Sequence, residues 1–133
     1  MILREMDYGP DPYTANIEQK AIANENFRYA VWTGDRLQMT LMCIPICGEI
    51  GLEMHDDTDQ FIRIEQGCGR VMMGECQGRQ DFRKMLNKGD VAFVPAGTWH
   101  NVINTGRGAL KISSIYAPPN HPSGTLERTK ESY

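Results

Sequence analysis

Long apolar runs and long basic runs are both missing from this chain of 133 residues. No apolar stretch approaches the roughly 18 residues needed to cross a bilayer, so we expect no membrane span. No basic run exceeds two residues and the net charge is −3, which argues against nucleic acid and anionic membranes as partners. The start of the chain carries Arg4, Glu5 and Asp7 and lacks the apolar core of a secretion signal. We therefore expect a cytoplasmic protein.

Paired cysteine spacings are missing as well. The four cysteines show neither a CxxC pair nor the spacing of a zinc ribbon, and they stand at Cys43, Cys47, Cys68 and Cys76. In a reducing compartment such residues are most often buried small hydrophobes or free thiols. We predict neither a disulfide nor a thiol catalyst.

A convincing helical period is also lacking, whereas short strands are indicated throughout. Turns rich in Gly, Pro, Asn and Asp separate apolar or alternating runs at 29–33, 37–46, 81–86 and 110–116. Repeated short strands of this kind indicate an all-β sandwich or barrel, and the length suits one domain. We predict an extended N-terminal arm with room for one short strand (1–27), a barrel (28–116) and a C-terminal tail that packs on the barrel (117–133).

The run from Gly89 to Asn104 is the most informative stretch. It reads G-x5-P-x-G-x2-H-x3-N, with Pro95 and Gly97 forming a tight corner and His100 at the start of the next strand. Five fixed positions in one window form a strong signal. This spacing resembles the second motif of the cupin family at every fixed position. The resemblance implies a double-stranded β-helix, which is a jelly-roll barrel.

The family's first motif, roughly G-x5-H-x-H-x4-E-x6-G, should then end at Gly67. In this alignment His55 takes the second histidine position, while Glu53 replaces the first histidine and Gln60 replaces the glutamate. Cys47 stands where the opening glycine would be. The resemblance therefore implies a metal site made of Glu53, His55, Gln60 and His100.

A competing alignment would use His55 as the first histidine and Asp57 as the second. The glutamate position would then fall near Phe61 or Ile62, neither of which can bind a metal. That alignment also breaks the spacing to Gly67, so we reject it.

Side-chain alternation supports the chosen alignment independently, because successive residues of a strand point to opposite faces. Glu53 and His55 share one face. The inward face of the following strand should carry Gln60, Ile62 and Ile64. Its outward face should carry Phe61, Arg63 and Glu65. In the run 37–46, Gln38, Thr40 and Met42 share one face, but its inward register stays open; if that face is inward, it favours a hydroxylated ligand.

Two imidazoles, one carboxylate and one amide oxygen form a borderline-to-hard ligand set. Iron, manganese, nickel, cobalt and zinc all suit it, and a divalent ion with one anionic ligand can act as a Lewis acid. Exchange of a histidine for Glu53 and of a glutamate for Gln60 keeps the number of ionisable ligands. We therefore favour a metal site over a barrel that has lost its metal.

Three functions follow from this interpretation. The first is a metalloenzyme, of dioxygenase, isomerase or lyase type, that acts on a small oxygen-rich metabolite, and a sugar-phosphate isomerase is one version of it. The second is a non-catalytic module that binds or senses a small molecule, and the third is an inert barrel. The candidate catalytic residues are Glu53 and His121. For His121, in the proline-rich tail, we weigh a place over the barrel mouth against a surface position and prefer the latter.

An outer apolar face suggests self-association. If the motif residues point inward, then Leu52, Met54, Trp99 and Ile103 point outward. Four large apolar side chains on an outer face need a cover, which a second subunit or the N-terminal arm would provide. We predict a homodimer with Trp99 near the interface.

Overall fold

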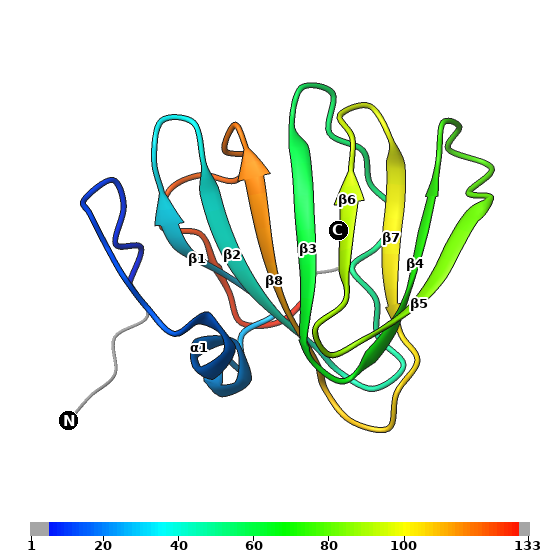
Figure 1. Ribbon diagram of the computed structural model, residues 1–133, viewed down its shortest axis with the longest axis horizontal. Coiled ribbons are helices and arrows are strands. Elements are labelled where there is room, and N and C mark those ends of the chain that lie inside the picture. The colour runs from blue at the N-terminus through cyan, green and yellow to red at the C-terminus, as the bar shows by residue number, and fades with distance from the viewer. Residues whose placement is uncertain (1–5, 131–133) are drawn as a thin grey trace.

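The computed structural model describes residues 6–130 and shows two antiparallel sheets that face each other (Figure 1). The larger sheet has six strands in the order β6-β3-β8-β2-β1-β9, and the smaller has three in the order β5-β4-β7. The strands are β1 (Arg28–Thr33), β2 (Gln38–Ile44), β3 (Asp59–Gln66), β4 (Cys68–Gly74), β5 (Phe82–Asn87), β6 (Val91–Val94), β7 (Trp99–Asn104), β8 (Leu110–Ala117) and β9 (Leu126–Glu127). This arrangement confirms the predicted all-β double-stranded β-helix.

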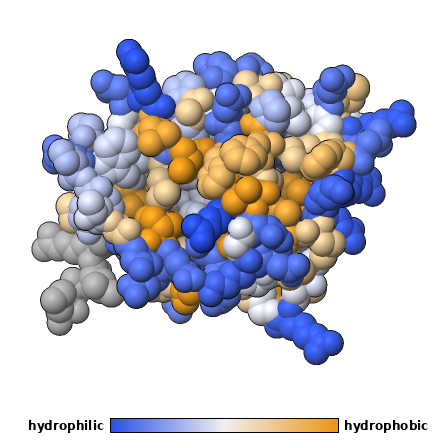
Figure 2. Space-filling view, viewed as in Figure 1, coloured by the Kyte–Doolittle hydropathy of each residue, from blue (hydrophilic) through white to orange (hydrophobic). Residues whose placement is uncertain are grey.

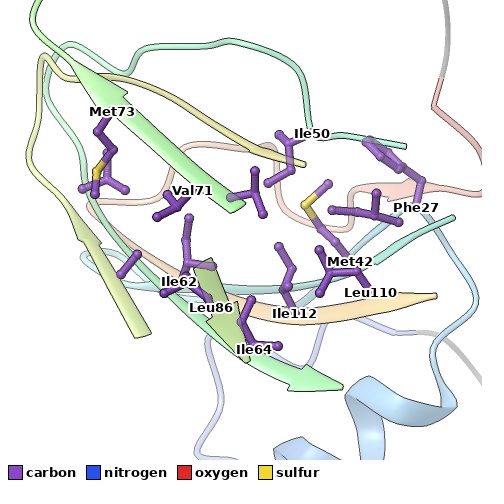
Figure 3. Packing of buried hydrophobic residues seen from close by; sticks show 14 residues of the cluster. Phe27, Met42, Ile50, Ile62, Ile64, Val71, Met73, Leu86, Leu110 and Ile112 are labelled. Atoms are coloured by element: carbon purple, nitrogen blue, oxygen red, sulfur yellow. The ribbon is translucent and has the colours of Figure 1, made fainter. Parts of the chain in front are cut away.

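The interior between the sheets changes from apolar at one end to polar at the other. At one level of the larger sheet the strand register aligns Met42, Ile112 and Ile64. They belong to a cluster of 14 buried apolar residues that packs between the sheets (Figure 3). Two residues further along each strand, the register aligns Thr40, Ser114 and Ile62, and two residues further again it aligns Gln38, Tyr116 and Gln60. Gln38 and Thr40 are therefore inward, which settles the register that the sequence left open.

The N-terminal arm is not wholly extended, so this part of the prediction is wrong. Residues Ile17–Ala23 form a helix, α1. The backbone N–H of Gln19 donates to Oδ1 of Asn16 at 2.9 Å, which caps the first turn. The helix contains Glu18, Gln19, Lys20 and two alanines, all good helix formers. Seven residues are too few for a clear apolar period, which is why the sequence did not reveal it.

The arm covers the outer face of the larger sheet (Figure 1). Ala21 of α1 is fully buried in a second apolar cluster with Tyr29, Val31 and Leu41 of β1 and β2. Full burial of one such aliphatic side chain contributes roughly 1.5–3 kcal/mol. The arm is therefore part of the folded domain.

Glu65 lies outside the barrel, as expected, yet it is buried with 1 % of its surface exposed. Its Oε2 accepts a hydrogen bond from Oγ of Ser113 at 2.6 Å. Nearby, Nζ of Lys111 donates to the carbonyl oxygen of Asn24, the residue that ends α1. The arm thus closes over a polar part of the outer face as well as an apolar one.

The C-terminal tail returns to the larger sheet. Strand β9 pairs with β1 through Arg28 opposite Glu127 and Tyr29 opposite Leu126. Nζ of Lys130 donates to the carbonyl oxygen of Glu49 at 3.3 Å, so the tail also contacts the segment before the first motif. A strand of two residues shows no alternation that a sequence could reveal.

Within the described residues, no helix is long and apolar enough to cross a membrane.

Large apolar side chains are exposed mainly outside the face predicted to need a cover. Leu52 is 39 % exposed, whereas Met54, Trp99 and Ile103 are half-buried. Within the strands, the most exposed large apolar side chains lie on β5 and β6, namely Phe82, Met85 and Phe93. Figure 2 shows apolar surface gathered across the middle of the face that carries these strands. An apolar groove of about 310 Å³ lies there, lined in part by Phe82 and Phe93. The homodimer stays a prediction.

All four cysteines are free thiols, as predicted. Cys43 and Cys68 are half-buried, whereas Cys47 and Cys76 are exposed, so the exposed pair fits the second of the two alternatives, free thiols, and not buried small hydrophobes.

Candidate metal centre

Glu53 and His100 are held opposite each other by their own backbones. Glu53 N–H donates to the carbonyl of His100 at 3.0 Å, and His100 N–H donates to the carbonyl of Glu53 at 2.8 Å. This reciprocal pair forms an isolated antiparallel bridge. Residues directly opposite on such a bridge project to the same face, so both side chains enter the interior together.

The corner before His100 fixes the position of His55. Gly97 has a φ of 81°, a conformation that favours glycine, and its N–H donates to the carbonyl of His55 at 2.7 Å. The backbone N–H of Thr98 donates to the carbonyl of Pro95 at 3.1 Å and closes the turn. The fixed glycine and proline of the motif therefore bring the first motif against the second.

The ring of His100 is oriented by a neighbouring backbone group. Its Nδ1 lies 2.9 Å from the carbonyl oxygen of Thr98. Since a carbonyl can only accept, Nδ1 carries a proton, and Nε2 is the nitrogen that faces the cluster. Metal-binding histidines are commonly oriented in this way. His100 is fully buried, so Nε2 lies in the interior.

Three of the four predicted ligands come together in one cluster. One ligand atom from each of Glu53, His55 and His100 lies within 4.8 Å of the other two. Oε1 of Glu53 is 3.5 Å from Nε2 of His55 and 3.5 Å from Nε2 of His100. None of these three atoms has a hydrogen-bond partner within the described part of the chain.

Gln60, the fourth predicted ligand, is buried on the inward face of β3 with 3 % of its surface exposed. Its Nε2 lies 3.3 Å from the hydroxyl of Tyr116 and 3.5 Å from that of Ser114. These two contacts orient the amide so that its oxygen, Oε1, points away from both hydroxyl groups. That oxygen is buried and finds no partner among the described residues.

The donor atoms fit a divalent metal ion. Buried polar atoms are nearly always hydrogen-bonded, and each exception calls for an explanation such as a bound ion. Here one buried atom of each of the four predicted ligands is an exception: Glu53 Oε1, His55 Nε2, Gln60 Oε1 and His100 Nε2. All four are lone-pair donors of the kinds that iron, manganese, nickel, cobalt and zinc accept.

The electrostatics of the cluster keep Glu53 ionised. Burial by itself would raise the pKa of its carboxyl, but the contacts with the rings of His100 and His55 outweigh burial and hold the pKa well below its usual range. An anionic oxygen is therefore available to a cation at any physiological pH.

Tyr116 forms the wall beside this cluster. It is 1 % exposed, and its ring lies edge-on to His55 with a centroid distance of 5.8 Å. Burial, and then the negative charge of Glu53, raises the pKa of its phenol to about 12. The phenol stays protonated at neutral pH, so it can donate a hydrogen bond to a ligand.

His121 reaches the barrel mouth, so the surface position that we preferred for it is wrong. Its ring packs edge-on against Tyr116 at a centroid distance of 5.1 Å. Gln38 holds its backbone, with Nε2 donating to the carbonyl of His121 at 2.8 Å and Oε1 accepting from its N–H at 2.9 Å. Burial, and then the positive charge of Arg28, lowers the pKa of His121 to about 4, so the ring is neutral at pH 7. It lies outside the three-residue cluster.

Arg28 is the interior residue that the sequence analysis missed. It shares a face of β1 with Ala30, which pairs with the inward Thr40, and it is 8 % exposed. Its Nη1 lies 2.6 Å from Oε1 of Glu127. Counting two residues back from Ala30 would have found it, but only once the inward face of β1 was known.

The comparisons with known proteins agree with this fold. A family model described as "Cupin domain" matches residues 40–116, which is more than half of the chain, and the protein therefore belongs to the cupin family. The uncharacterized protein YrkC of Bacillus subtilis (strain 168) is 52 % identical over 124 residues, which cover 93 % of this chain and 67 % of YrkC. The uncharacterized protein L612 of Acanthamoeba polyphaga mimivirus is 34 % identical over 116 residues, which cover 86 % of this chain and 71 % of L612. The crystal structure of BH2720 from Bacillus halodurans has a TM-score of 0.91 and 50 % identity, and the match covers 92 % of this chain and 93 % of that one.

Proposed function

We propose that this cupin binds one divalent transition metal ion through Glu53, His55, Gln60 and His100 and acts as a metalloenzyme on a small oxygen-rich metabolite. The observation that carries the proposal is the set of four buried donor atoms, one from each residue, that find no partner among the described residues. A metal ion supplies the partner that each atom lacks. Iron, manganese, nickel, cobalt and zinc are the candidate ions.

A divalent ion held by one carboxylate and neutral donors supplies Lewis-acid chemistry, because it keeps net positive charge toward a ligand oxygen. The residues around it would bind and orient the ligand. Tyr116 offers a phenol proton and Thr40 a hydroxyl group at the polar end of the interior, while the amide of Gln38 is engaged by the backbone of His121. These groups suit a hydroxylated or keto metabolite and support oxygenation, isomerisation and lyase chemistry alike.

His121 is the best candidate for moving a proton. The pKa of its ring is about 4, so the ring is neutral at pH 7 and has a free lone pair, and ligand binding would have to raise this pKa toward neutrality for the ring to act as a base. Glu53 is less suited to that role, since its carboxylate serves as the anionic donor of the metal cluster.

Elemental analysis of the untagged protein tests the metal site. Wild type is expected to carry near-stoichiometric transition metal, and His55→Ala and His100→Ala are expected to lose it. His121→Ala removes the remaining histidine of the chain and is the matched control, because that ring lies outside the cluster and should not affect metal content. Wild type that stays metal-free after incubation with all five ions would overturn the proposal. A non-catalytic binding module would show the same metal but no turnover of any ligand that binds.

The sugar-phosphate version is less well supported. The inward cation Arg28 already has a carboxylate partner, Glu127. A phosphate dianion would meet a single guanidinium that is partly neutralised, whereas phosphate sites usually gather several donors.

A further inference from the structure

Arg28 has an unusual environment for a buried cation. Its guanidinium side chain is 10 % exposed, and it projects from β1 toward the inward side of β2, where Nη2 lies 4.0 Å from Sδ of Met42. A buried arginine is normally saturated with acceptors, because an unpaired N–H in the interior costs free energy. The hydrogen bonds that Arg28 makes are therefore informative.

One edge of this guanidinium is open. The group carries five N–H donors in a planar fork. Nη1 pairs with Oε1 of Glu127 at 2.6 Å, and the guanidinium carbon lies 5.4 Å from the ring centroid of Phe27. Within residues 6–130, Nη2 has only the weak acceptor Sδ of Met42 as a hydrogen-bond partner. Nε is buried and finds no partner within residues 6–130. Nε and Nη2 form the edge that binds a carboxylate through two parallel hydrogen bonds.

This open edge belongs to the same interior as the metal cluster. Arg28 and Ala30 share the inward face of β1, and Ala30 lies opposite Thr40 of β2. The next inward residue of β2, Gln38, lies opposite Tyr116, whose ring contacts that of His55. A small molecule bound at the cluster and beside Tyr116 would therefore extend toward Arg28.

The charges favour a carboxylate over a more highly charged group. With a divalent ion bound, the two carboxylates of Glu53 and Glu127 and the guanidinium of Arg28 leave a net charge of about +1 at the site. A carboxylate adds one negative charge and has the planar shape that the Nε–Nη2 edge matches. A phosphate dianion would over-compensate the site beside Glu127.

We propose that the Nε–Nη2 edge of Arg28 is a second anchoring point of the ligand site, which takes the carboxylate of a small organic acid whose other end binds at the Glu53–His55–His100 cluster. This inference rests on the proposed metal site and names the class of ligand for it. Glu127 would hold the guanidinium in place through Nη1 while the other edge binds the ligand. The simpler reading, in which Arg28 only fastens β9 to β1, leaves the unpaired Nε unexplained.

The test uses cobalt(II)-loaded full-length protein, and the visible spectrum of the ion reports binding. The probes are malonate, succinate and glutarate, each compared with its monomethyl ester, which has nearly the same length and one charge fewer. On wild type, at least one diacid is expected to bind about tenfold or more tightly than its ester. Arg28→Gln should abolish this preference. Arg28→Lys keeps the charge opposite Glu127 and hence the fold, and it should lose about tenfold because it lacks the fork. Arg36→Gln, at an exposed turn, is the matched control and should retain the preference.

Two outcomes would overturn the inference: no diacid preference in wild type, or a preference that survives in both Arg28 variants. Arg28 variants that are merely less stable, with the preference intact, would show that the residue only fastens the tail. Metal content is measured on the same samples, so failure of the metal site is seen separately. If the metal site fails, the shift in Tm that each diacid causes is measured on the metal-free proteins instead. Equal shifts in wild type and Arg28→Lys would then reject the carboxylate site at Arg28 independently of the metal.

Discussion

Replacement of Glu53 by glutamine tests the metal centre most sharply, because it removes one charge and leaves the shape of the side chain. Oε1 of Glu53 lies 3.5 Å from both imidazole Nε2 atoms, and it is the one anionic donor among the four proposed ligands. Loss of an outer partner of a metal ligand already costs about 10–100-fold in affinity. We expect loss of the anionic donor itself to cost at least about 100-fold.

The expected magnitude is a shift in thermal stability. Metal present at about 100 times its Kd stabilises the folded state by about 2.7 kcal/mol. Unfolding entropy of about 2.1 cal/mol/K per residue gives roughly 0.28 kcal/mol/K for 133 residues, so metal should raise the Tm by about 10 °C. At the same metal concentration, Glu53→Gln would sit near its own Kd and gain about 0.4 kcal/mol, or only one to two degrees.

Differential scanning calorimetry with and without added metal measures this increment, and any difference between the metal-free proteins cancels. Glu49→Gln is the matched control, because Glu49 lies on the same segment but contacts Asn101 instead of the histidines. It should keep the full increment. An equal increment in wild type and Glu53→Gln would refute the assignment of Glu53 as the anionic ligand.

Four further outcomes are expected. Gln60→Glu should tighten metal binding by about tenfold, measured by competition with a chelator. It should also lower the stability of the metal-free protein, because it buries a second carboxylate. Weaker metal binding would argue against Gln60 as a ligand. The pKa of His121 falls from 6.5 to about 4 on folding, so the unfolded chain binds more protons between these values and stability decreases as the pH drops through them. His121→Asn should remove of the order of 1–2 kcal/mol of that decrease in urea unfolding, and an unchanged pH profile would contradict the buried position of the ring. Leu41→Ala, beneath the arm, should cost about 2–5 kcal/mol but leave metal content unchanged, and a cost under about 1 kcal/mol would show that the arm is not firmly packed. Light scattering should show a homodimer with Trp99 near its interface, and a monomer across micromolar concentrations would contradict it.

The site could be located from the sequence because spacing and alternation constrain strands strongly. In the motif, Gly97 creates a corner that nothing bulkier adopts easily, and His100 follows it at a set distance. The period of two predicts Glu53 and His55 on one face and Gln60 on the inward face of β3. The structure forms only an isolated bridge at Glu53, and the backbone hydrogen bond from Gly97 to His55 completes the placement. The structure brings Glu53, His55 and His100 together, and whether they hold a metal stays a prediction.

The motif alignment and the alternation of side chains along a strand do not show how separate segments pack against one another. Helix α1 depends on a single cap at Asn16 and gains its stability from packing on the sheet, which no local pattern announces. Glu65 is buried on the outer face, where it accepts from Ser113 and where α1 packs against β3 and β8. Arg28 points inward because of the register of β1. The tail that folds back along β1 brings Glu127 to Arg28 and His121 to the barrel mouth, and the Arg28–Glu127 contact joins residues 99 positions apart.

Of the four proposed ligands, three are linked to the smaller sheet and one lies on the larger sheet. Glu53 and His55 are tied by backbone hydrogen bonds to β7 and to the corner before it, so they belong mechanically with His100 and the smaller sheet. Gln60 alone among the four stands on the larger sheet, and an amide oxygen is the weakest donor of the set. If the site holds the proposed ion, outward movement of the larger sheet would separate only Gln60 from it. Glu53, His55 and His100 would then keep the ion while a ligand enters.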